Sequence, residues 1–136
     1  FFSEMHYRYP DRVGLTIGFV PELSKKIYAG ADMFLMPSQS EPCGLAQMIA
    51  LRYGTIPIVR ETGGLRDSIH DAGDKSGNGF TFKSYNAHDM LDAVVRARAY
   101  YDDKMKWGRL VNTALKQDFS WTKSAKDYIA LYNDIH

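Results

Sequence analysis

The stretch "MFLMPSQSEPCGLAQMIALRYGTIPIVRETGG", residues 33–64, decides the fold. Residues 32–36 are a short apolar run and predict a strand that is buried on both faces. Residues 44–53 predict a mostly apolar helix that ends at a glycine. Residues 55–60 are rich in β-branched side chains and predict a second strand. A strand, a helix and a strand joined by short connections favour a parallel sheet wrapped by helices.

The same alternation extends from this stretch toward both ends of the chain. Helical or alternating apolar spacing and capping residues mark the further elements. We expect the end of a helix at 1–9, a strand at 13–17, a helix at 21–30, a helix opened by 62–64 and running to 69, a loop at 71–78, a strand at 79–82, a helix capped by Asn86, a helix capped by Asp102 or Asp103 and running to 115, and a last helix capped by Ser120 or Thr122.

Composition places the chain among ordinary globular proteins. It has 136 residues, of which 45% are hydrophobic and 24% charged, enough for one domain with a core. The net charge of +1 gives no reason to expect a nucleic acid or a membrane as partner. The single cysteine, Cys43, excludes an intramolecular disulfide and fits a reducing compartment. The chain opens on Phe1 rather than Met, and we expect it to be a piece of a longer protein.

Three loops are expected at the carboxyl ends of the strands, where ligands bind in sheets of this kind. They cover residues 18–20, 37–44 and 61–64. Two of them place glycine at a helix start, where free N–H groups and the helix dipole favour phosphate and glycine lets a ligand come close. Neither loop is a Walker A or a G-x-G-x-x-G motif. The residues alone therefore predict an α/β domain with an anion site.

Residues 29–69, "AGADMFLMPSQSEPCGLAQMIALRYGTIPIVRETGGLRDSI", resemble the nucleotide-sugar-binding half of bacterial glycogen synthases and plant starch synthases. The blocks AGAD, PS-x-x-EPCGL-x-Q, RYG-x-x-P-I-V-R and TGGL-x-D-(S/T)-I follow that family's order and spacing. "GNGFTF" at 77–82 and "DFSWTKSAKDYIALY" at 118–132 resemble later parts of it. The resemblance implies a GT-B glycosyltransferase, which has two Rossmann-like halves around a cleft. It implies transfer of glucose from ADP-glucose, with retention, to the non-reducing end of an α-1,4-glucan such as glycogen.

The resemblance also implies how the chain is organised. Residues 1–119 would form a partial Rossmann-like nucleotide-sugar-binding domain that lacks its first strands, and residues 120–136 the C-terminal crossover helix. The family's N-terminal half, with its catalytic His, and an Arg and a Lys that neutralise the diphosphate have no counterpart here, so we expect the N-terminal half as a partner. The apolar stripe of Tyr128, Ile129 and Tyr132 should then be partly exposed. The implied location is the cytoplasm of a bacterium or the plastid of a plant.

The resemblance assigns the catalytic role to Glu41, which is implied to hold the hydroxyls of the donor sugar and to stabilise positive charge at its ring. Phe19 is implied to stack on the adenine. The other residues are implied to line the donor site at helix starts, largely through backbone N–H groups. The implied donor-binding residues are Phe19, Cys43, Gly44, Leu45, Thr62, Gly63 and Gly64. The four histidines show no metal-ligand spacing, so neither a metal nor a cofactor is expected.

Plainer interpretations stay open beside these. Glu41 could be a solvated or capping acid, Phe19 a core residue, Cys43 a small buried residue and residues 62–64 a tight turn. The whole chain could be a non-catalytic module that binds a sugar nucleotide or a glucan. It could also come from another GT-B retaining transferase, such as a relative of sucrose synthase or trehalose-phosphate synthase. Ile49 argues against those enzymes, because many GT-B proteins have a second Glu at that position.

Overall fold

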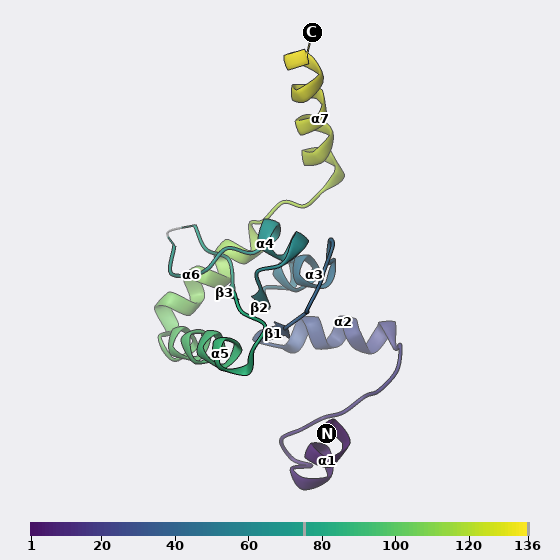
Figure 1. The fold of residues 1–136 in the computed structure, drawn as a ribbon, viewed down its shortest axis with the longest axis vertical. Helices are drawn as coiled ribbons and strands as arrows, with labels where there is room; N and C mark the ends of the chain where they lie inside the picture. The colour runs from purple at the N-terminus through teal and green to yellow at the C-terminus, as the bar shows by residue number, and fades with distance from the viewer. Residues whose placement is uncertain (75, 136) are drawn as a thin grey trace.

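The computed structural model describes residues 1–74 and 76–135. Strands and helices alternate through the middle of the chain, and helices follow (Figure 1). In chain order the elements are α1 (Phe2–Arg8), α2 (Pro21–Gly30), β1 (Met33–Met36), α3 (Ala46–Tyr53), β2 (Ile56–Arg60), α4 (Gly63–Ser68), β3 (Phe80–Phe82), α5 (Ala87–Asp102), α6 (Lys104–Leu115) and α7 (Trp121–Ile135).

The three strands form one parallel sheet in the order β1-β2-β3. Met33 of β1 lies opposite Ile56, and Ile58 of β2 lies opposite Phe80. The chain passes through α3 between β1 and β2, and through α4 between β2 and β3. All three strands therefore end at the same edge of the sheet, and the loops that follow them meet there.

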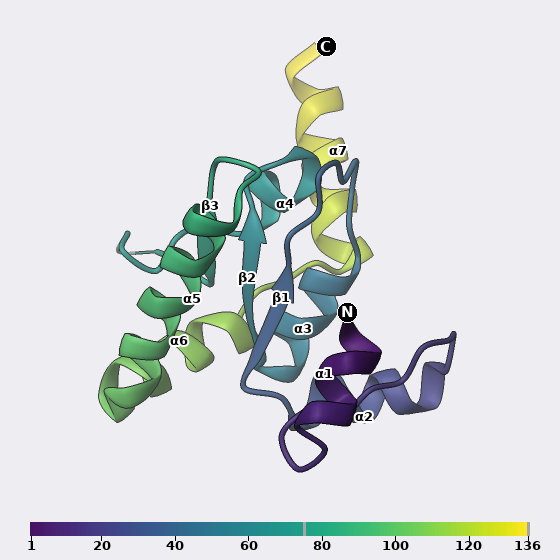
Figure 2. The same ribbon diagram turned by 60° about the horizontal axis from the view of Figure 1, so that its bottom comes forward.

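The core lies around the central strand β2, whose residues 56–59 are all buried. Helix α5 packs on β3 and β2, and α3 packs on β2 and β1, while α6 contacts both helices. Figure 2 shows the strands between α5 and α3. The buried hydrophobic residues of the core cluster are Leu51, Ile56, Ile58, Val59, Leu65, Ile69, Phe80, Phe82, Ala93, Ala97, Trp107, Leu110 and Ala114. Their burial holds the sheet edge, and with it the loops, in place.

Most predicted helix ends are confirmed. Helix α3 stops at Gly54, whose φ of 80° lies in the left-handed region that favours glycine. Asn86 caps α5 by accepting a hydrogen bond from the backbone N–H of Asp89 at 2.9 Å. Of the paired candidates, Asp103 caps α6, and Ser120 accepts a hydrogen bond from the first turn of α7.

One predicted strand is wrong. Residues 13–17 belong to no strand, and Ile17 is 81% exposed. An extended segment becomes a strand only by pairing, and within the described residues β1 pairs with β2 alone. The segment instead connects α1 to α2 as irregular chain. The last strand begins at Phe80, one residue later than predicted, because Gly79 forms only an isolated bridge.

The two end helices lie apart from the sheet. Neither α1 nor α7 has a buried residue, and Figure 1 shows them at opposite ends of the molecule. Tyr128 and Ile129 are each 59% exposed and Tyr132 is 60% exposed, which confirms the predicted exposure of this stripe. The division of the chain at residue 119 stays a prediction. Across 1–74 and 76–135, no helix combines the length and hydrophobicity needed to traverse a bilayer.

Candidate functional site

The loops that follow β1 and β2 interlock at the carboxyl edge of the sheet. β1 continues through residues 37–45 into α3, and β2 continues through a short turn into α4. The backbone N–H of Gly64 faces two carbonyl oxygens of the first loop, that of Glu41 at 3.2 Å and that of Pro42 at 3.1 Å. The two loops therefore behave as one structural unit, and Glu41 lies at their junction.

Gly63 and Gly64 are needed because the backbone of residues 41–43 lies directly against them. A Cβ added to Gly63 would lie 2.0 Å from the carbonyl oxygen of Glu41, and one added to Gly64 would lie 2.0 Å from that of Cys43. Gly63 also has a φ of +44°, in the left-handed region. The sequence suggested that these glycines make room for a ligand. In the structure they make room for the protein's own loop.

The backbone N–H groups of the two loops divide into bonded and free ones. The N–H of Gly64 is bonded to the first loop. The N–H groups of Cys43, Gly44, Leu45 and Gly63 donate to no partner among the residues that the structure describes. Three of these four directly precede α3, where the helix dipole favours an anion. The β1–α3 loop therefore offers more free donors than the start of α4.

Glu41 keeps acceptor capacity for a ligand. Its side chain is half-buried, and the hydroxyl of Ser38 lies 3.5 Å from Oε2, a long hydrogen bond. An ionised carboxylate has about four acceptor positions, so most of them remain for other donors. The same loop therefore carries both a carboxylate, at Glu41, and backbone amides with no partner among the described residues, which begin two residues later at Cys43.

The side chain of Gln47, on α3, holds the loop at residues 37–45 in place through hydrogen bonds, a role that the sequence analysis missed. The side chain is fully buried, and its Nε2 donates to the carbonyl of Gly44 at 2.8 Å and to the hydroxyl of Ser68 on α4 at 3.0 Å. Its Oε1 is buried without a hydrogen-bond partner in the described part of the chain. A glutamine in the apolar first turns of this helix was the signal, since a buried polar side chain needs partners.

Arg60, at the end of β2, connects the loops that follow β1 and β3, a role that the sequence did not indicate. Its Nε donates to the carbonyl of Ser38 at 3.0 Å, and its Nη2 donates to the carbonyl of Gln39. Its Nη1 donates to the carbonyl of Lys83, after β3, at 3.4 Å. The guanidinium also lies over the ring of Tyr85, 5.7 Å from the centroid. An arginine that ends a buried strand was the available signal.

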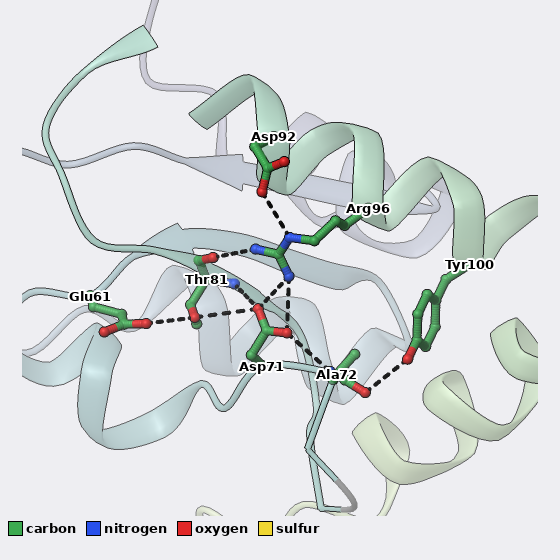
Figure 3. Close-up of polar contacts among 8 residues, drawn as sticks. Glu61, Asp71, Ala72, Thr81, Asp92, Arg96 and Tyr100 are labelled. Carbon is green, nitrogen blue, oxygen red and sulfur yellow. Dashed lines mark hydrogen bonds and ion pairs between the residues drawn. The ribbon is translucent and has the colours of Figure 1, made fainter. Parts of the chain in front are cut away.

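A charged network supports the turn after β2 from the side of β3 (Figure 3). Arg96 Nη1 donates to both carboxylate oxygens of Asp71, at 2.9 and 2.7 Å, and Nη2 donates to the carbonyl of Thr81 at 2.7 Å. The hydroxyl of Thr81 donates to Glu61 at 2.8 Å. Because Glu61 directly precedes Thr62, the network fixes the residue that leads into α4.

The same network sets the protonation of Asp71. Burial alone would raise the pKa of this carboxyl, but hydrogen bonds from Arg96, Thr81 and Gly73, together with the charge of Arg96, outweigh it. The pKa of Asp71 therefore lies below its usual value. Asp71 remains ionised through the neutral range, so the pair with Arg96 is present under ordinary conditions.

The structure brings all predicted site residues together except Phe19. The ring of Phe19 is 94% exposed, so its interpretation as a core residue is wrong. The segment between α1 and α2, which carries it, lies away from α4 in both views (Figures 1 and 2). Cys43 is exposed rather than buried. Within the described ranges, no three His, Cys, Asp or Glu side chains gather in a way that could hold a metal ion.

Comparison with known proteins identifies the family. The model of the family described as glycosyl transferases group 1 matches residues 7–109. The chain belongs to this family. Within it, the chain is similar to the glycogen synthase of Anoxybacillus flavithermus, with 55% identity over 137 residues, covering 99% of this chain and 28% of that protein. The glycogen synthase of Bacillus anthracis is also 55% identical, with 99% and 29% covered. This group 1 chain therefore spans less than a third of the length of these relatives.

Structures of other glycosyltransferases show the same fold. The catalytic domain of starch synthase IV from Arabidopsis thaliana, bound to ADP and acarbose, has a TM-score of 0.84 and 42% identity, covering 98% of this chain and 29% of that one. Sucrose-phosphate synthase from Thermosynechococcus elongatus has a TM-score of 0.67 and 23% identity, covering 98% and 33%, a likeness of fold alone. The resemblance of this group 1 chain to glycogen and starch synthases is confirmed, and so is its fold class, a parallel sheet flanked by helices as in GT-B glycosyltransferases.

Proposed function

We propose that this chain is the donor-binding half of a glycogen or starch synthase. The enzyme would transfer glucose from ADP-glucose to the non-reducing end of an α-1,4-glucan, with retention of configuration. The observation that carries the proposal is the position of Glu41, a half-buried carboxylate at the interlocked loops, directly before free backbone amides. The 55% identity to proteins named glycogen synthase supports the choice of substrates.

Glu41 and the amides have complementary tasks in the proposed reaction. The carboxylate accepts hydrogen bonds from donor-sugar hydroxyls, and its charge stabilises the oxocarbenium-like ring as the bond to the diphosphate breaks. The N–H groups of residues 43–45 would stabilise the opposite charge, because they can donate hydrogen bonds to the diphosphate oxygens as negative charge develops on this leaving group. One loop would thus serve both sides of the breaking bond.

The start of α4 is proposed to form part of the wall of the donor site and to offer few hydrogen-bond donors to the ligand. Thr62, Gly63 and Gly64 line the donor site, but the N–H of Thr62 is bonded to Arg60 and that of Gly64 to the first loop. Of the three, Gly63 is the one whose N–H has no partner among the described residues. For Phe19 to stack on adenine, the segment between α1 and α2 has to lie near this edge of the sheet when donor is bound. Closure by such a movement is common in transferases, since it excludes water.

The remaining parts of the reaction belong to other partners. We propose that the N-terminal half of a GT-B enzyme supplies the second wall of the cleft, and that a glycogen chain is the acceptor. The single cysteine fits a reducing compartment, so the proposal places the enzyme in a bacterial cytoplasm or, for a plant protein, a plastid. The 55% identity to glycogen synthases makes a non-catalytic module or a sucrose synthase relative the weaker interpretation.

The test uses the full-length protein that the native reading frame encodes. It is incubated with glycogen and either ADP-glucose or UDP-glucose, and release of the nucleoside diphosphate is followed. We expect turnover with ADP-glucose, and a fall in kcat on the order of 10²–10³-fold for Glu41→Ala with little change in ADP affinity. Glu22→Ala, an exposed acid on α2, is the matched control and should retain wild-type kcat.

Each outcome decides between the interpretations. ADP binding without transfer by the wild-type protein would favour a binding module and overturn the proposal. Turnover with UDP-glucose alone would correct the donor. A near-normal kcat for Glu41→Ala would remove Glu41 from the reaction even if the enzyme is a synthase.

A further inference from the structure

We propose that Arg60 is a positioning residue that holds the Glu41 carboxylate in its reactive place. The inference rests on the proposed function, because it concerns the residue that acts on the donor sugar. Two hydrogen bonds lead from one side chain to the other. Arg60 Nε donates to the carbonyl of Ser38 at 3.0 Å, and the hydroxyl of Ser38 lies 3.5 Å from Oε2 of Glu41.

Arg60 restrains the first part of the loop, which has no other hydrogen bond to the rest of the protein among the described residues. Later in the loop, the backbone at Glu41 and Pro42 is bonded to Gly64, and that at Gly44 is bonded to Gln47. The described contacts to the carbonyls of Ser38 and Gln39 come from Arg60. Without them, the first half of the loop could move while the second half remained in place, and the Glu41 side chain would lose its contact with Ser38.

The environment of the Arg60 side chain suits it to holding the two loops. The backbone of Arg60 is fixed by pairing with Phe82 in the sheet, and Tyr85 covers the guanidinium. Three of its N–H groups point at three carbonyl oxygens on two loops. A guanidinium presents its donors in a rigid planar fork, whereas a lysine ammonium is a compact point charge. Lysine could keep the charge at this position but could not bond both loops at once.

The competing interpretation is a direct contact between Arg60 and the donor diphosphate. The two ideas differ in what they predict for binding. A diphosphate contact acts in the ground state as well as the transition state, so its loss weakens ADP binding. A positioning role acts through Glu41, so its loss lowers kcat and leaves ADP affinity almost unchanged.

The experiment measures kcat, donor KM, ADP affinity by calorimetry and melting temperature for Arg60→Lys and Arg60→Gln in the full-length protein. Because a misplacement of about 1 Å can cost about 10²-fold in rate, we expect kcat to fall by about 10- to 100-fold while ADP affinity stays within about threefold. Arg66→Gln is the control, since Arg66 is an exposed arginine on α4 whose described hydrogen bond goes to the carbonyl of Glu61 at 3.3 Å, and not to residues 37–45.

A double-mutant cycle isolates the connection to Glu41. In the Glu41→Ala background, Arg60→Lys should cost less than about twofold in kcat, because the side chain that it positions is already gone. Additive losses, an ADP affinity weakened by more than about tenfold, an unchanged kcat, or unfolding of both variants would each overturn the positioning role. A wild-type protein without transfer activity would instead refute the proposed function, and the inference with it.

Discussion

Replacing Gly64 with alanine tests the contact between the two loops. The added Cβ would lie 2.0 Å from the carbonyl oxygen of Cys43 and 2.6 Å from its carbonyl carbon. Both are backbone atoms, so no side-chain rotation can relieve the overlap. Ordinary van der Waals contact begins at 3.4 Å, so the loop has to move by about 1.4 Å, and the hydrogen bonds from the Gly64 N–H to Glu41 and Pro42 are lost with it.

The expected effect is large on activity and moderate on stability. A misplacement of this size can cost about 10²-fold in rate. Overpacking together with a lost hydrogen bond costs about 2–4 kcal/mol. The assay is transfer from ADP-glucose to glycogen by the full-length protein, with thermal denaturation beside it. We expect kcat to fall by about 10²-fold and the melting temperature to fall.

Gly108→Ala is the matched control. Nothing lies within 4 Å of a Cβ built at Gly108, which is inside α6. Alanine is favoured over glycine within a helix by about 0.5–1 kcal/mol, so this variant should keep its kcat and melt at the same or a higher temperature. Wild-type kcat and melting temperature for Gly64→Ala would refute the claim that the two loops share a fixed backbone contact.

Three further predictions concern other parts of the chain. Phe19→Ala should weaken ADP binding by roughly 1–3 kcal/mol and leave the melting temperature unchanged, because the ring is exposed; unchanged affinity in calorimetry would remove Phe19 from the donor site. The pKa of Asp71 is lowered in the folded protein, so its stabilising effect is fully present above the unfolded pKa of about 3.9 and is lost as the pH falls through the folded value. Asp71→Asn should therefore destabilise the protein more at pH 7 than at pH 3, and an equal effect at both values in denaturant titrations would contradict this. Residues 1–136 alone should show no detectable transfer, because the proposed mechanism needs a second half of the enzyme. They should also self-associate through the exposed apolar side chains of α7; turnover of even a few per cent of the full-length rate, or a monomer in light scattering, would count against these expectations.

The sequence predicted the central alternation well, because its signals there are local. Buried strands such as β2 are continuous apolar runs, and Gly54 and Asn86 are residues that end or begin helices for steric and hydrogen-bonding reasons. The strand at 13–17 failed because a strand is defined by its neighbour, and apolar alternation within five residues carries no information on whether a neighbour is present.

The position of the site stays a prediction from the sequence, and the contacts between its two loops could not be predicted. Strand-end loops pointed to residues 18–20, 37–44 and 61–64, the last two with glycine at a helix start, and the family resemblance pointed to Glu41. The contact of Gly63 and Gly64 with residues 41–43 joins segments about 20 positions apart in the sequence, so no local pattern reports it. The distant partners of Arg60 and Gln47 lie on the loop after β3 and on α4, so the local signals at these two residues did not show what they bond.

The shared backbone contact between the two loops has a consequence for protein engineering. A chimera that imports residues 37–45 from another transferase brings a backbone path shaped against that protein's own turn, and this turn admits no Cβ at Gly63 or Gly64. The smallest segment that can be exchanged without remaking the contact is therefore the continuous piece from residue 37 to residue 64. It carries both loops, the helix and strand between them, and Arg60, so the two loops could be transplanted together with two chain junctions.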